Sequence, residues 1–138
     1  TAHADAGIQA LWSIGCRYCQ TYYRAFAGHT LARAGDLAGA LARLDDSLSL
    51  VEPLPEPLHE SELYWHKARY LRASGAEASQ VRAAAAAAAD SARAGGKCRT
   101  EALVLMLLTD IELDEALLAR YRHRLHILKT QRPELSFF

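Results

Sequence analysis

Apolar residues recur along this 138-residue chain at spacings of three and four, and no segment sustains the alternation of a β-strand. Glycine or proline interrupts the pattern near residues 35, 53–57, 75, 95–96 and 133. The segments between these marks have the length of helices of about four to five turns. The pattern predicts a short helix in the first 15 residues and six longer ones near 18–34, 37–51, 57–75, 77–94, 98–112 and 115–131.

The residues at the predicted helix ends fit these boundaries. Gly35 and Gly75 suit the left-handed position that follows a helix, because glycine has no Cβ to clash there. Asp36 and Asp114 are expected to cap the next helices, since their side chains can accept bonds from free backbone N–H groups. Pro57 suits the first turn of a helix, where its missing N–H costs nothing.

Two of the predicted helices have unusual compositions. Residues 83–89 are seven consecutive alanines, whose small side chains would let this helix lie close to its neighbours. Compositional drift in an alanine-rich proteome is an alternative origin of the run. The run predicts a helix under either explanation. Residues 102–108 are all apolar, which indicates a helix that neighbours bury on several sides.

An internal repeat relates the predicted helices at an offset of 40 residues. Its unit is a helical hairpin: a helix, a tight turn, a second helix and a longer loop. The residues matched at this offset are Gly28 with Ala68, Gly35 with Gly75, Leu44 with Ala84, and Leu31 with Leu71 and then Ile111.

The first hairpin resembles the tetratricopeptide repeat, which has a small residue in its first helix, a large one three positions later, a Gly-Asp-type turn and an early alanine in its second helix. The residues at these positions are Gly28, Leu31, Gly35, Asp36 and Ala40. The second copy has Gln80 where alanine is expected, and the period of 40 exceeds the usual value of about 34. The resemblance implies one all-α domain over residues 1–138, a right-handed superhelix of antiparallel hairpins (a TPR-like α-α solenoid).

The order of the segments 30–35, 40–44, 61–67 and 92–97 is similar to the carboxy-terminal helical-repeat region of large bacterial ATPase-containing regulators. These include LuxR-type transcription factors and adenylate cyclase-associated ATPases. The resemblance covers most of residues 18–112 and implies a fragment of a cytoplasmic signalling or transcriptional regulator; Thr1 at the start agrees with a fragment. The sequence has no ATP-binding loop, so the activity of such a parent protein is not expected here.

Composition narrows the functional classes. The 16 basic and 16 acidic residues balance, so no global field attracts nucleic acid or membrane. The longest apolar stretch, residues 102–108, is far too short to span a bilayer. Three cysteines are too few for a disulfide framework and indicate a reducing compartment.

Cysteine chemistry is the main alternative to a binding function. Cys16 and Cys19 have metal-site spacing, but Cys98 stands alone and no second pair completes a zinc site. Two buried helical cysteines are the favoured interpretation, and His123 and His126 form only a weak metal pair. We expect no catalytic residue, metal or cofactor. A small cysteine-dependent redox or metal-binding protein remains the alternative.

Charge is uneven along the chain. Residues 36–62 hold seven acids against Arg43, whereas residues 115–132 hold five basic residues against Glu115. Nucleic-acid binding through this basic last helix is a further alternative, although a solvated outer face explains such a helix more simply.

The resemblance implies a partner-binding groove on the face built by the first helix of each hairpin. The expected partner is a protein or peptide, another part of the parent protein, or a second copy in a homodimer. Core positions for Tyr22 and Trp65 are the alternative, and the apolar tail 135–138 is expected to pack back on the array or on a neighbour. The groove residues implied by the resemblance are Tyr22, His29, Arg33, Glu62, Trp65, Arg69 and Arg72.

Overall fold

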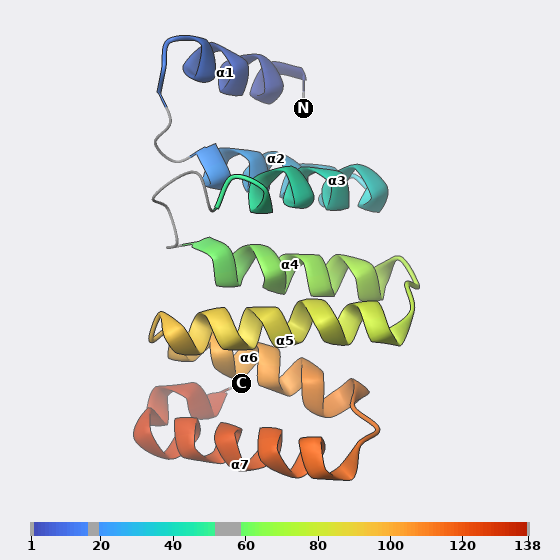
Figure 1. The fold of residues 1–138 in the computed structure, drawn as a ribbon, viewed down its shortest axis with the longest axis vertical. Helices are drawn as coiled ribbons and strands as arrows, with labels where there is room; N and C mark the ends of the chain where they lie inside the picture. Colours follow the sequence, from blue (N-terminus) through green and yellow to red (C-terminus); the bar gives the residue numbers. More distant parts are fainter. Residues whose placement is uncertain (1, 17–19, 52–58, 138) are drawn as a thin grey trace.

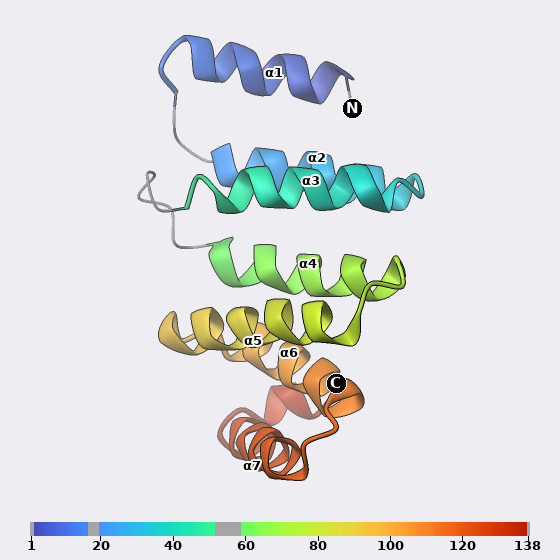
Figure 2. The same cartoon turned by 45° about the vertical axis from the view of Figure 1, so that its right-hand side comes forward.

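The computed structural model describes residues 2–16, 20–51 and 59–137, and these ranges are helical apart from short connections. They contain no strand, which confirms the predicted all-α class. Consecutive helices pack on one another, and the chain runs along the long axis of the molecule from α1 at one end to α7 at the other, with α2 and α3 at the same level (Figures 1 and 2). Their bounds are α1 Ala2–Ser13, α2 Gln20–Arg33, α3 Leu37–Leu48, α4 Glu60–Ala73, α5 Ala78–Ala94, α6 Cys98–Ile111, α7 Glu115–Gln131 and a final 3-10 helix, η2 Pro133–Phe137.

The two turns that carry the 40-residue repeat have the same geometry. Gly35 and Gly75 have φ angles of 88° and 74°, in the left-handed region that penalises residues with a Cβ. In each turn the N–H after the glycine donates to the carbonyl oxygen five residues before it, at 3.0 Å. The same ending also follows α1 at Gly15 and α5 at Gly96, so it is a common helix ending of this chain and not specific to the 40-residue offset. At Gly35 and Gly75 it joins α2 to α3 and α4 to α5 as antiparallel pairs (Figure 1).

A small residue lies where the helices of the first pair approach closely. A Cβ placed on Gly28 would lie 3.1 Å from the backbone oxygen of Ala40 and 3.1 Å from the Cβ of Arg43. Ala68, which matches Gly28 at the 40-residue offset, is fully buried on α4. Small side chains at these two positions let the helices pack closely.

The third pair, α6 and α7, is closed differently. The residue 40 positions after Gly75 is Glu115, the first residue of α7, so no glycine turn falls between these helices. Asp114 instead caps α7 by accepting bonds from the N–H groups of Ala116 and Leu117 at 2.9 Å. The predicted cap at Asp36 is confirmed as well, since its carboxylate accepts from Gly39 at 2.8 Å.

The alanine run of α5 forms much of the larger hydrophobic core. One side of the helix is buried, while Ala83 on another side is exposed. This core joins α4, α5, α6 and α7, and it surrounds α6 on several sides as its apolar sequence predicts. The buried alanines of α5 are Ala84, Ala85, Ala88, Ala89 and Ala92.

A buried carboxylate ties the last three long helices together. Glu101 of α6 is 1% exposed and accepts two hydrogen bonds from Arg124 of α7, at 2.8 and 2.9 Å. Arg93 of α5 donates a third, at 2.9 Å. Burial raises the pKa of Glu101, but the bonds from Arg124 and Arg93 outweigh it and hold the pKa below its usual value. Glu101 is therefore held as a carboxylate in the folded protein.

Two details of the sequence prediction need correction or completion. Cys16 is neither helical nor buried, because α1 ends at Ser13 and the chain turns at Gly15 with φ of 79°. Leu135, the first residue of the apolar tail, is 5% exposed and belongs to the larger core. The side chains of residues 136 and 137 and the whole of residue 138 lie outside the described part of the chain. Cys19 and Pro57 lie outside the described residues.

None of the helices in the described ranges has the length and apolar character that a membrane crossing requires.

Candidate partner-binding surface

One side of α4 lies open between α2 and α6. Positions 62, 65, 66, 69 and 72 recur at spacings of three and four, so they share one side of the helix, and all are partly or fully exposed. Ser61, Leu63, Ala68 and Tyr70 are the buried residues of the same helix. The open side includes four of the groove residues that the sequence predicts.

The first hollow on this side, the α2–α4 pocket, has a volume of about 260 Å³. Two aromatic residues of α2 stand at it, Tyr22 with 47% and Phe26 with 59% of their surface exposed. The ring of Tyr22 lies 5.5 Å from that of His59. The residues that line the pocket are Tyr22, Ala25, Phe26, His29, His59, Glu62, Leu63 and His66.

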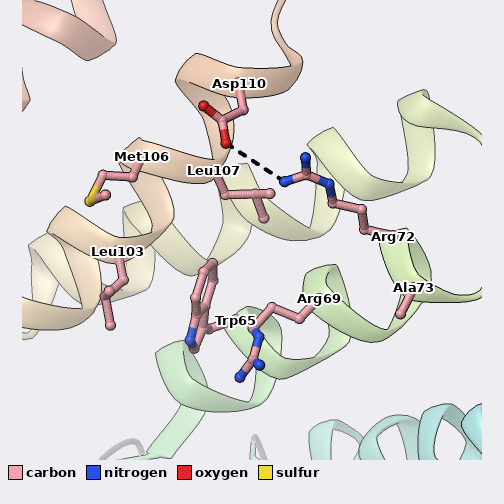
Figure 3. Close-up of a pocket in the computed structure, with 8 residues that line it drawn as sticks. All are labelled: Trp65, Arg69, Arg72, Ala73, Leu103, Met106, Leu107 and Asp110. Atoms are coloured by element: carbon pink, nitrogen blue, oxygen red, sulfur yellow. Dashed lines mark ion pairs between the residues drawn. The ribbon is translucent and has the colours of Figure 1, made fainter. Parts of the chain in front are cut away.

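The second hollow, the α4–α6 groove, is larger, with a volume of about 510 Å³ (Figure 3). Trp65 extends from α4 toward α6, where Leu103, Met106 and Leu107 form an apolar wall. The guanidinium of Arg69 lies 5.7 Å from the centre of the Trp65 ring. The remaining lining residues are Arg72, Ala73 and Asp110.

The arginines of the groove differ in their partners. Arg72 and Asp110 form a long ion pair of 3.8 Å across the end of the groove, with side chains 52% and 65% exposed. Such an exposed pair contributes little stability. Arg69 is exposed and has no carboxylate partner among the described residues.

The negative charge of Glu62, the acidic residue of the α2–α4 pocket, is balanced by a lysine of the same chain. Lys97 donates to its carboxylate at 2.8 Å, and Ser61 donates at 2.9 Å. Burial raises the pKa of Glu62, but these bonds outweigh it and lower the pKa below its usual value. Glu62 therefore stays ionised, yet its charge is balanced within the chain.

A cluster of rings connects α2 with α4 beside the same pocket. The Nδ1 atom of His29 and the hydroxyl of Tyr70 are hydrogen-bonded at 2.7 Å. The His66 ring lies 5.6 Å from that of His29 and 5.9 Å from that of Tyr70. Burial lowers the pKa of His66 from 6.5 to about 4, and the nearby Arg69 and His29 add to this effect. His66 is therefore uncharged at neutral pH.

The free energy of unfolding is expected to fall as the pH drops from about 6.5 to about 4, because unfolded His66 takes up a proton in this window while folded His66 does not. The variant His66→Phe keeps a ring but cannot protonate, so it should lose stability less steeply over the window. Denaturant unfolding at several pH values measures both slopes. Identical slopes for the two proteins would contradict the placement of an uncharged His66 at this interface.

The structure brings most of the predicted groove residues together. Tyr22, His29 and Glu62 line the α2–α4 pocket, whereas Trp65, Arg69 and Arg72 line the α4–α6 groove. Arg33 is exposed at the end of α2 and lines neither hollow. Trp65 is partly buried against the larger core as well as open to the groove, while Tyr22 is 47% exposed and belongs to neither core cluster.

Sequence reasoning missed part of each lining. Phe26 follows Tyr22 by four residues, and this helical spacing was a usable signal that both share one side of α2. The contribution of α6, with Leu103, Met106 and Asp110, had no comparable signal, because its uniformly apolar sequence marks no open side.

The sequence also suggested a metal or cysteine site and a basic helix for nucleic acid, and the structure shows where those residues lie. Within the described ranges, no three His, Cys, Asp or Glu side chains come together as possible metal ligands. Cys98 begins α6 as predicted, with its sulfur 3.6 Å from the carbonyl oxygen of Gly96. On the basic helix α7, Arg124 is bound to Glu101, which reduces the free positive charge that helix could offer a nucleic acid.

Comparison of the chain with protein-family models, curated proteins and solved structures gives no significant match.

Proposed function

We propose that this chain is a TPR-like, right-handed superhelix of helical hairpins that binds a protein or peptide partner on the side formed by α2, α4 and α6. We further propose that it belongs to a cytoplasmic bacterial signalling or transcriptional regulator, in which it has a non-catalytic, scaffolding role. The observation that carries the binding proposal is the position of the two hollows, which adjoin the same open side of α4.

The composition of this side supports a protein partner. Aromatic, methionine and arginine side chains are enriched in protein interfaces, and Tyr22, Phe26, Trp65, Arg69 and Met106 all line the hollows. Two neighbouring polar groups are bonded within the chain, since His29 is hydrogen-bonded to Tyr70 and Glu62 to Lys97. Such a surface offers apolar contact area and arginine donors to a protein partner.

The double variant Trp65→Ala with Arg69→Ala is expected to reduce partner capture at least about tenfold, because tryptophan and arginine are the residues that most often dominate interface energies. Capture from a bacterial lysate by the immobilised chain measures this loss, and circular dichroism measures helicity in parallel. The matched control, Arg122→Ala with His123→Ala, changes two exposed residues of α7 and should capture as the unchanged chain does.

Because Trp65 also touches the core, Arg69→Glu provides a second variant that alters only an exposed side chain. It should lose capture while keeping full helicity. Equal loss in the α7 control, or retained capture in both groove variants, would show that the partner binds elsewhere. Collapse of helicity in the double variant alone would assign Trp65 to the core and leave Arg69→Glu as the deciding result.

A further inference from the structure

Arg69 combines three properties that distinguish it among the charged residues along α4. It is exposed, it has no carboxylate partner among the described residues, and its guanidinium is placed over the Trp65 ring. A cation–π contact at 5.7 Å uses none of the guanidinium N–H groups, and Arg69 makes no hydrogen bond or ion pair to another described residue, so its N–H donors remain available. These donors match the two oxygens of a carboxylate.

Arg72 adds a second donor group at the same groove. Its partner Asp110 is 3.8 Å away, and both side chains are more than half exposed, so the pair is weak and open to competition. The groove lining carries two arginines against one aspartate, which gives it a net positive charge. A carboxylate from outside could therefore be bound by Arg69 and compete with Asp110 for Arg72.

The rest of the groove is apolar. Trp65, Leu103, Met106 and Leu107 form the apolar part of the lining of this hollow, whose volume is about 510 Å³ (Figure 3). Methionine is flexible and adapts to different apolar partners. A bulky apolar side chain next to the carboxylate would bury apolar surface against Leu103, Met106 and Leu107.

We infer that the α4–α6 groove binds an acidic protein segment, with a carboxylate on the Arg69 guanidinium and an adjoining bulky apolar side chain against Trp65 and Met106. This inference rests on the proposed function and specifies the ligand of one of its two hollows. The charge balance of the lining and the free donors of Arg69 select an acidic segment over a neutral or basic one.

Capped peptides test the inference directly. The probe is acetyl-Glu-Glu-Leu-Glu-Glu-amide, and its controls replace every glutamate by glutamine or by lysine. The chain has two tryptophans, so the background variant Trp12→Phe leaves Trp65 as the fluorescent reporter in the groove. We expect the glutamate peptide to bind about tenfold more tightly than the glutamine peptide, as hydrogen bonds between charged groups allow. This advantage should shrink as salt is added.

Three variants locate the effect. Arg69→Gln should remove the preference for the glutamate peptide, and Asp110→Asn should increase its affinity about two- to fivefold by releasing Arg72. Arg33→Gln removes the same charge from an exposed residue outside both hollows, so it should change the affinity less than about twofold. All three positions are exposed, so folding should be preserved.

The inference is overturned if no peptide binds at about millimolar concentration, if the glutamate and glutamine peptides bind equally, or if the lysine peptide binds more tightly. It is also overturned if Arg69→Gln and Arg33→Gln change the affinity equally. A chain dimer in light scattering that Arg69→Gln dissociates would place a second copy in the groove and also overturn it.

If partner capture depends on Trp65 and Arg69 while the peptides show no charge preference, only the acidic ligand is wrong. If capture is independent of these residues, the proposed function itself is wrong.

Discussion

Replacing Arg124 with alanine is expected to lower the free energy of unfolding by about 3 kcal/mol, because it leaves a buried carboxylate without its main partner. Glu101 is 1% exposed, and two of its three hydrogen bonds come from Arg124. Arg93 would remain, but its side chain is 49% exposed and donates a single hydrogen bond to Glu101. Denaturant unfolding at pH 7, followed by circular dichroism, measures the loss.

Two further variants separate a buried charge from general damage to α7. Arg93→Ala should cost only about 1 kcal/mol, since it removes one bond from a solvent-exposed donor. The double variant Glu101→Met with Arg124→Met should recover most of the loss, because apolar side chains of similar size need no charged partner. A stability of Arg124→Ala within about 0.5 kcal/mol of the unchanged chain would contradict the buried Glu101 network.

Replacing Ala88 with leucine is expected to lower the free energy of unfolding by about 2 to 3 kcal/mol, because the added atoms must enter a filled core. Ala88 is fully buried in the larger core, between α5 and its neighbours. The same measurement of denaturant unfolding applies. This variant tests whether the alanine run is needed for close helix packing.

Ala83→Leu is the matched control, since it lies in the same run on an exposed side of α5. It should change stability by less than about 0.5 kcal/mol. Equal effects of the two substitutions would contradict the packing role and favour compositional drift as the origin of the alanines.

The helix boundaries were largely predictable because local chemistry determines them. Asp114 caps α7, and the predicted range 115–131 is the observed helix. Gly35 and Gly75 end α2 and α4 through the same hydrogen-bonded turn, so these two helix ends could be predicted from the sequence. These features depend on a few neighbouring residues and on little else in the fold.

Features that depend on how helices cross were not predictable. Glu101 sits in a nearly apolar helix, and its partners are 8 and 23 residues away, on two other helices. The ring contact of His29 with His66 likewise depends on how α2 lies beside α4. The groove was predicted in part, since the residues of α4 follow from helical spacing, whereas those of α6 required the packing of α6 on α4.

Site-specific photo-crosslinking in living bacterial cells tests most directly whether the side formed by α2, α4 and α6 binds a partner. A benzoylphenylalanine at Phe26 samples the α2–α4 pocket, one at Ala73 samples the α4–α6 groove, and one at the exposed His123 of α7 is the control. We predict the same crosslinked partner from the first two positions and none from the third. Crosslinks from His123 alone, or from all three positions equally, would contradict the account.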